Sequence, residues 1–299
     1  MPLIAPKISA PSKILKAFQA LISVIYRLAY LSHRRLFLKP KEALKHSKLI
    51  VVGSFLAGGA GKTPFSLYLA KQILQQQKTL AILCHSKARD EQRWLQKKLP
   101  GCPVYHTKNR HQQAKKIDGQ FDIILCDDGF EDSRLAPDLK IALRWGEQAQ
   151  SIFELIPRGH CRSLEKDHSN IHLSLLCGLA FQNPDIEFQI STITNSQHQK
   201  LQKPAIAMCG IGNPDRFFKD LQKHGISLID KIKRKDHDTR FETHLQKTLL
   251  KQQPIIITEK DYHRLGLQTQ KNPLLYVAPQ KIKVHPHIAL ERVLQQILQ

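Results

Sequence analysis

Apolar runs alternate with helix-like segments along most of this chain after Lys48. Continuous apolar runs occupy residues 48–53, 79–84, 121–128 and 139–145, and another follows within 170–179. Strands that are apolar throughout, separated by helices, are typical of a parallel sheet covered on both faces. The pattern therefore predicts an α/β fold: a mostly parallel sheet with helices on both faces.

The pattern changes around residues 190–204, where ISTITNSQHQKLQKP is polar and alternating, as expected of an extended connector. A second set of strand-like and helix-like segments begins at Ala205 and continues through PIIITEKD. We expect three parts: a lead-in with an amphipathic helix at 1–48, a large α/β domain at 49–195, and a smaller C-terminal α/β domain at 196–299.

The first fifty residues form a basic, amphipathic segment. Its apolar positions recur at helical spacing, at Ile14, Phe18, Leu21, Ile25 and Leu28. The same fifty residues hold ten lysines and arginines but one glutamate. The apolar run AFQALISVIY is well short of the roughly 20 residues that a transmembrane helix needs. Two interpretations stay open: a helix lying in a membrane interface, or a helix packed on its own domain with a solvated basic face.

The whole chain is strongly basic, with 46 Lys and Arg against 25 Asp and Glu, a formal charge of +21. Such a charge favours an anionic partner: nucleic acid, phospholipid headgroups or a phosphorylated substrate. The six cysteines are scattered without a C-x-x-C pair, which favours reduced core thiols over a disulfide framework or a zinc site. His168 and His172 have helical spacing but no third ligand nearby, so we expect surface residues.

A glycine-rich turn follows the first apolar run. The strict phosphate-loop pattern G-x-x-x-x-G-K-[ST] fails, because Leu56 stands where its first glycine belongs. The remaining residues still allow backbone N–H groups to converge on phosphate oxygens at a helix N-terminus: Gly58, Gly59, Ala60, Gly61, Lys62 and Thr63. Lys62 can reach the β- and γ-phosphates, and Thr63 can offer its hydroxyl to Mg²⁺. A tight turn without a ligand is the alternative, but the order strand, glycines, Lys-Thr, helix favours a P-loop NTPase-like domain that binds ATP.

Asp127 and Asp128 end the apolar run at 121–128. Two carboxylates at the end of a buried strand can simply cap the next segment. Beside a Lys-Thr phosphate loop, holding Mg²⁺ directly or through water is the better interpretation.

Several further motifs accompany the loop. They are VVGSFLAGGAGKTP, DDGFEDSRLAPDLKI, IPRGHCRSL, GIGNPDRFFKDLQKHG, DHDTRF and IITEKDYHRL. Their order and approximate spacing resemble the tetraacyldisaccharide 4'-kinase family, the lipid A 4'-kinases, from the N-terminus to about residue 265. The later motifs have no reason to accompany a generic phosphate loop, which makes the combined signature specific.

The resemblance implies ATP- and Mg²⁺-dependent transfer of the γ-phosphoryl group to the 4'-hydroxyl of a tetraacylated lipid A disaccharide 1-phosphate, giving lipid IVA in lipid A biosynthesis. The substrate is acylated and membrane-held. The N-terminal helix is then expected to dock on an anionic membrane, peripherally, at the cytoplasmic face of the bacterial inner membrane. No nucleic-acid partner is expected.

The resemblance also implies catalytic residues. The segment beginning ARDEQRW is similar to the family's Asp-Glu region, which makes Asp90 the candidate base. RKDHDTRF is similar to the segment that supplies a partner histidine, here His237. An Asp-His pair can orient and deprotonate a sugar hydroxyl while Lys62 neutralises phosphoryl charge and domain closure excludes water. Arg162 matches the family's arginine and can stabilise phosphate charge. By residue type alone, all three could be ordinary surface residues.

This chain departs from the family's pattern at Ser54, Glu131, Asp132, Ser163 and Asp238, and the segment before Asp90 is shorter. These changes bear on substrate contacts and turnover more than on nucleotide binding. Two alternatives follow: a partitioning or assembly ATPase with a deviant phosphate loop, and a catalytically degenerate membrane-binding homologue. The deviant loop requires a lysine where this chain has Ala57.

Overall fold

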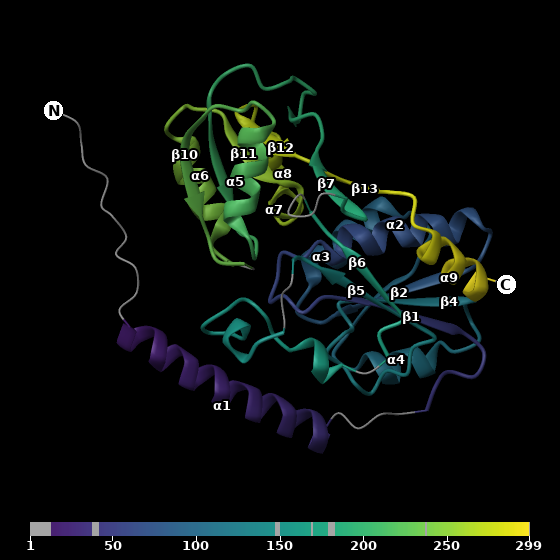
Figure 1. Cartoon of the computed structure of the whole chain (residues 1–299). Coiled ribbons are helices and arrows are strands. Elements are labelled where there is room, and N and C mark those ends of the chain that lie inside the picture. The colour runs from purple at the N-terminus through teal and green to yellow at the C-terminus, as the bar shows by residue number, and fades with distance from the viewer. Residues whose placement is uncertain are drawn as a thin grey trace.

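The structure, a computed structural model, describes residues 13–37, 42–146, 150–168, 170–178, 183–236 and 238–298. The described chain forms two lobes, each built on its own sheet, with one long helix along the outside of the first lobe (Figure 1).

The first lobe contains a six-stranded parallel sheet in the order β3-β2-β4-β1-β5-β6. Its strands are β1 (Lys48–Gly53), β2 (Leu80–His85), β3 (Val104–Thr107), β4 (Ile123–Asp127), β5 (Leu139–Arg144) and β6 (Leu173–Leu176). The central strands are buried on both faces, as their continuous apolar sequences require. The predicted α/β fold is confirmed.

Helices cover both faces of this sheet. On one face lie α2 (Lys62–Gln75), α3 (Arg89–Lys98) and α9 (Ile288–Leu298). Their apolar side chains, including Phe65 and Leu95, pack on Ile50, Ile82 and the other strand residues of that face. The opposite face carries α4 (Arg110–Lys116), together with a loop that contains the short 3-10 turns η1 (Ile152–Glu154) and η2 (Glu165–Asp167).

The second lobe contains a five-stranded sheet in the order β10-β9-β11-β12-β8. Its strands are β8 (Thr194–Asn195), β9 (Ala205–Cys209), β10 (Leu228–Lys233), β11 (Ile255–Thr258) and β12 (Leu275–Ala278). Only β8 is antiparallel to its neighbour. Its helices are α5 (Pro214–Lys223), α6 (Phe241–Leu249), α7 (Glu259–Tyr262) and α8 (Leu267–Gln270). The stretch 190–204, expected to be a connector, therefore includes an edge strand of this sheet.

A two-stranded antiparallel ribbon joins the lobes. It pairs β7 (Ile186–Ile190), on the way out of the first lobe, with β13 (Gln280–Val284), on the way back, through five residue pairs. After the ribbon, α9 packs on the core of the first lobe, where Leu290 is 3% exposed. The chain therefore passes twice between the lobes, and Figure 1 shows the ribbon between α2 and the second sheet.

Helix α1 (Lys13–Phe37) lies along the first lobe with its polar side facing inward. Ser23 and Tyr26 donate to the backbone carbonyls of Leu155 and Arg162, at 3.0 and 2.8 Å. Arg27 pairs with Asp167 at 2.8 Å. The opposite side exposes large apolar side chains at Leu15, Phe18, Leu21, Val24, Ile25, Leu28, Leu31, Leu36 and Phe37. Among the described helices, none is long and apolar enough to span a membrane.

Candidate phosphoryl-transfer site

The glycine-rich turn leads directly from β1 into α2. Gly58, Gly59 and Gly61 have φ angles of 102°, 67° and 75°, a region that side chains with a Cβ rarely adopt. At Gly61 a Cβ would also lie 2.1 Å from the ring of Phe188. Lys62 begins the helix and is buried, so its ammonium faces the cavity described below, at the positive end of the helix dipole.

The sheet order places the two aspartates beside this turn. β4 is the parallel neighbour of β1, with Val52 opposite Asp127 in the register. Carboxyl ends of neighbouring parallel strands meet at one edge of the sheet, where open α/β folds bind ligands. The structure thus brings Lys62, Thr63, Asp127 and Asp128 together, as the sequence predicts.

Asp127 is a buried carboxylate, 2% exposed, that accepts a hydrogen bond from Ser66 Oγ at 2.8 Å. Burial, with the nearby charges of Glu91 and Asp128, raises its pKa to about 7 despite hydrogen bonds from Ser66 and Thr63. Among the described residues, no lysine or arginine forms an ion pair with it. Asp127 therefore lies where a cation would stabilise its charge.

Asp128 has cationic partners. Its carboxylate contacts Arg162 at 2.7 Å and Lys62 at 3.5 Å, while Arg110 donates to its backbone carbonyl at 2.9 Å. Burial alone would raise the pKa of Asp128, but the charges of Lys62 and Arg162 outweigh burial and hold the pKa well below its usual range. Asp128 occupies a left-handed conformation with φ 53°, which turns the chain immediately after the strand.

These residues fit a magnesium nucleotide. Mg²⁺ prefers oxygen ligands and is usually held by one or two carboxylates together with substrate phosphates. Thr63, Asp127 and Asp128 supply hard oxygen donors beside the phosphate loop, and the burial of Asp127 leaves a charge that a cation would neutralise. The described residues contain no cluster of three or more His, Cys, Asp or Glu of metal-binding geometry, so substrate oxygens and water would complete the coordination.

A cavity of about 640 Å³ extends from the phosphate loop to the second lobe. The first lobe contributes residues 57–64, His85, Lys87, Ala88, Glu91, Trp94, Arg110, Asp128, Glu131 and Arg162 to its wall. The second lobe and ribbon contribute Ile190, Ile211, Gly212, Arg216, Phe217, Asp220, Asp236, Thr258, Glu259, Lys260, Ala278 and Gln280. The cavity therefore lies between the two lobes, and each lobe contributes both cationic and carboxylate side chains to its wall.

Asp90 lies in the first turn of α3, with Glu91 beside it. The Lys260 ammonium approaches Asp90 at 3.5 Å and Glu91 at 3.1 Å. Glu91 lines the cavity, whereas the side chain of Asp90 is 8% exposed and does not belong to the cavity wall. Its proposed partner His237 lies outside the described residues, and the neighbouring Asp236 lines the cavity.

Arg216 fixes the phosphate loop from the second lobe. Its guanidinium donates to Gly59 O at 2.9 Å and lies over the rings of Trp145 and Phe188, 4.7 and 5.2 Å from their centroids. Trp145 donates to Ala60 O at 3.0 Å. Two carbonyls of the loop are therefore held by hydrogen bonds, while its residues line the cavity. Sequence analysis missed Arg216, and the only local signal was the motif GIGNPDRFF.

A polar network connects α1 to the cavity wall. Glu131 accepts hydrogen bonds from Tyr30 Oη at 2.6 Å and from Ser163 Oγ at 2.7 Å, and His168 Nε2 lies 2.8 Å from Ser163 Oγ. The surface position expected of His168 is wrong, because this residue is 7% exposed. Burial and nearby cations lower its pKa to about 2, which keeps it neutral.

Two of the departures from the family pattern, Glu131 and Ser163, are therefore bonded to each other. A third, Asp132, forms two hydrogen bonds with Arg134, both at 2.8 Å. These three side chains thus have hydrogen-bond partners within the fold.

Comparison with known proteins gives a consistent result. The model of the family described as tetraacyldisaccharide-1-P 4'-kinase matches residues 12–87 and 85–299. Curated tetraacyldisaccharide 4'-kinases include one from Haemophilus influenzae, 28% identical over 84% of this chain and 83% of its own length, and one from Chlamydia abortus, 29% identical over 83% and 80%.

Among solved structures, LpxK from Aquifex aeolicus, crystallised in complex with ATP, superposes with a TM-score of 0.68. It is 21% identical, and the match covers 95% of this chain and all of that one, which shows a common fold. Because the family model spans nearly the whole chain, this protein belongs to the tetraacyldisaccharide-1-P 4'-kinase family.

Proposed function

We propose that this protein is a tetraacyldisaccharide 4'-kinase, which transfers the γ-phosphoryl group of ATP to the 4'-hydroxyl of a tetraacylated lipid A disaccharide 1-phosphate. One observation carries the proposal beyond family membership: the phosphate loop and Glu91, at the acidic start of α3, line one and the same cavity between the lobes. A phosphoryl donor and an alcohol acceptor can meet there.

At the donor end, the loop amides and Lys62 bind the β- and γ-phosphates, and Thr63, Asp127 and Asp128 hold Mg²⁺. When bound, Mg²⁺ neutralises charge on the transferred phosphoryl group. Lys62 and Arg162 contact Asp128 in this structure, at 3.5 and 2.7 Å. Both cations therefore already lie beside the site, and Arg162 can turn from Asp128 to phosphate oxygens.

At the acceptor end, Asp90 accepts the proton of the 4'-hydroxyl, and His237 orients the pair. The proton must leave the hydroxyl as the new P–O bond forms, so a carboxylate at this place lowers the barrier. Glu91 lines the cavity, whereas Asp90 does not, so this role requires the Asp90 carboxylate to move toward the acceptor. A small rotation of the α3 start, or closure of the lobes, would provide that movement.

Transfer of ³²P from [γ-³²P]ATP to the lipid disaccharide tests this assignment. We expect product with wild type and with Asp215→Ala, an exposed aspartate on α5, and a loss of about 10²-fold or more with Asp90→Ala. Absence of transfer in wild type would instead support an assembly ATPase or a degenerate homologue. Full activity of Asp90→Ala would remove the proposed base.

The outward apolar side of α1 supports a membrane role. A helix packed on its own domain normally buries its apolar side, but here the polar side contacts the protein and Phe18, Leu21, Ile25 and Leu28 are each more than half exposed. The chain also carries a strong positive charge, which attracts anionic lipid. We propose that α1 lies in the interface at the cytoplasmic face of the bacterial inner membrane, within reach of an acylated substrate.

Vesicle sedimentation tests this placement without removing the contacts of α1. The triple variant Phe18→Gln, Leu21→Gln, Ile25→Gln should bind anionic phosphatidylglycerol vesicles at least about tenfold more weakly than wild type, since three large apolar groups no longer enter the interface. The matched control is Lys71→Gln, an exposed basic residue on α2. Equal binding of wild type and triple variant would contradict the proposal.

A further inference from the structure

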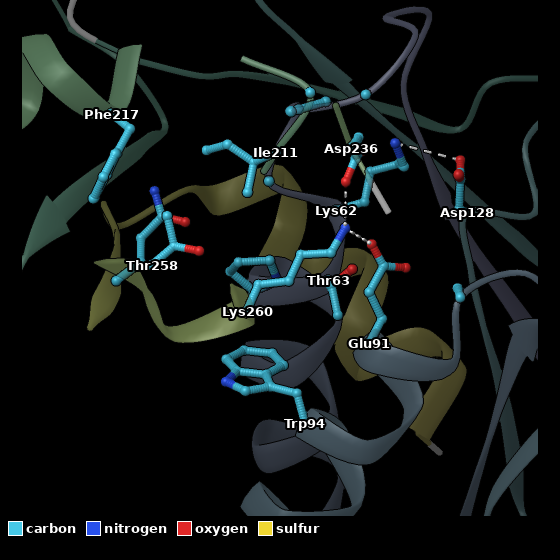
Figure 2. Close-up of a pocket in the computed structure, with 18 of the residues that line it drawn as sticks. Lys62, Thr63, Glu91, Trp94, Asp128, Ile211, Phe217, Asp236, Thr258 and Lys260 are labelled. Carbon is cyan, nitrogen blue, oxygen red and sulfur yellow. Dashed lines mark hydrogen bonds and ion pairs between the residues drawn. The ribbon is translucent and has the colours of Figure 1, made fainter. Parts of the chain in front are cut away.

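Three carboxylates surround one lysine at the junction of the lobes. Lys260 Nζ lies 3.1 Å from Glu91 Oε1, 3.3 Å from Asp236 Oδ1 and 3.5 Å from Asp90 Oδ2. Figure 2 shows the lysine extended from the second lobe, with its ammonium between Glu91 and Asp236. We call these four residues the Lys260 cluster.

The cluster joins the segments that carry both candidate catalytic groups. Asp90 and Glu91 begin α3 in the first lobe, whereas Asp236 belongs to the second lobe and directly precedes His237. Lys260 is the second residue of α7. A single side chain therefore contacts the candidate base and the residue next to its proposed partner.

The backbone under Lys260 is firmly held. The fully buried carboxylate of Asp261 accepts hydrogen bonds from Gly210 N at 3.0 Å and Thr258 Oγ1 at 2.7 Å, and it pairs with Arg264. These bonds fix the turn between β11 and α7. Lys260 consequently approaches the cavity from a rigid base, as a positioning group should.

Attraction between the Lys260 ammonium and three carboxylates holds the cluster together. Three carboxylates within reach of each other repel, and the cavity wall shields them from water more than an open surface would. Burial alone would lower the pKa of Lys260, but Glu91, Asp236 and Asp90 outweigh burial and raise it, so the lysine stays charged. Without the ammonium, the carboxylates would separate.

We propose that Lys260 is a positioning residue for phosphoryl transfer, which holds the carboxylates of Asp90 and Asp236 together at one point between the lobes. This inference rests on the proposed role of Asp90. In this role Lys260 fixes the geometry of carboxylates that act on the acceptor, through its contacts with Asp90, Glu91 and Asp236. Its loss should therefore lower kcat more than it weakens ATP binding.

A second ion pair provides the control. Lys98, at the end of α3, contacts Glu259, at the start of α7, at 2.7 Å. This pair joins the same two helices, but here the lysine is on α3 and the carboxylate is on α7. Lys98 forms no ion pair with Asp90, Glu91 or Asp236 among the described residues. If Lys260 merely ties the lobes together, removing either lysine should have the same effect.

The experiment compares full-length wild type, Lys260→Met, Lys260→Arg and Lys98→Met in the ³²P-transfer assay, with thermal unfolding of each variant. We expect kcat to fall about 100-fold in Lys260→Met, because a displaced catalytic group costs about that much, while KM for ATP changes less than about threefold. Lys260→Arg should recover at least about tenfold of the loss, and Lys98→Met should stay within about twofold of wild type.

The proposal is overturned if Lys260→Met and Lys98→Met have equal kcat, if only KM rises, or if Lys260→Arg is no better than Lys260→Met. Should Lys260→Met fail to fold, the double variant Lys260→Met, Asp236→Asn keeps the charge of the cluster, and wild-type kcat in that variant would also overturn it. An inactive wild type or an active Asp90→Ala would refute the proposed function or base, so the failures are distinguishable.

Discussion

Two groups of carboxylates lie near the cavity: Asp127 and Asp128 follow a single buried strand, whereas the other three, Asp90, Glu91 and Asp236, come from both lobes and surround Lys260. The first group, Asp127 and Asp128, has its side-chain partners within the first lobe, on α2 and the loop that carries Arg162. The Lys260 cluster depends on how the lobes meet. The donor end is thus a local product of one sheet edge, whereas the acceptor end depends on tertiary arrangement.

The largest expected effect comes from removing Lys62, the lysine beside Asp128. Lys62→Ala should reduce kcat/KM for transfer by about 10³-fold, because the ammonium that faces the phosphates is lost. Asp128 keeps Arg162 at 2.7 Å, so the variant should remain folded. Lys71→Ala, exposed on the same helix, should stay within about twofold in the ³²P-transfer assay. Retention of more than about a tenth of the activity would place the donor end elsewhere.

Replacing Asp127 tests the donor end through the free energy of unfolding. Its pKa is raised to about 7 by burial, so the folded protein binds a proton more readily than the unfolded chain, and stability falls as pH rises from about 4 to 7. Without metal, Asp127→Asn should raise the free energy of unfolding at pH 8 by on the order of 3 kcal/mol, with the gain vanishing toward pH 4.

Urea unfolding in EDTA measures this change. The control is Asp118→Asn at the surface, where the carboxylate accepts three backbone N–H bonds and the substitution should destabilise instead. A pH-independent effect of Asp127→Asn would show that the carboxylate carries no burial penalty.

The smallest effect probes the hydrogen bond that Arg216, in the second lobe, donates to the phosphate loop. Arg216→Ala removes the bond to Gly59 O and the contacts with Trp145 and Phe188, so KM for ATP should rise about tenfold with little change in kcat. Steady-state kinetics with Lys219→Ala, an exposed neighbour on α5, provides the comparison. An unchanged KM would show that Arg216 does not contribute to ATP binding.

The arrangement of the residues at the proposed donor end could be predicted from the sequence because each step there is local. A glycine turn that needs positive φ, a helix start and two carboxylates after an apolar strand are all visible in consecutive residues. The parallel sheet and its covered faces follow from the same apolar runs. The apolar side of α1 is also visible in the sequence, as a helical periodicity. That this side faces solvent follows from the polar contacts of Ser23, Tyr26 and Arg27, which place the opposite side against the first lobe.

The acceptor end could not be predicted in the same way. Asp90 and Lys260 are distant in the sequence, and the motif TEKD carries no sign that its lysine contacts α3. Asp90 itself came from family resemblance, as did Arg162. The prediction that His168 lies at the surface was wrong because sequence spacing does not show that the ring of Phe130 covers it. The two ring centroids are 4.5 Å apart. Long-range contacts, not residue types, decided these positions.

The double crossing of the backbone constrains how the cavity can change shape. β7 and β13 are paired over five residues, so any swivel of one lobe about the ribbon axis would shear those hydrogen bonds, while a bend across the ribbon strains them far less. The ribbon therefore favours hinge bending of one lobe against the other. Such bending widens or narrows the cavity between the lobes and keeps β7 and β13 in register.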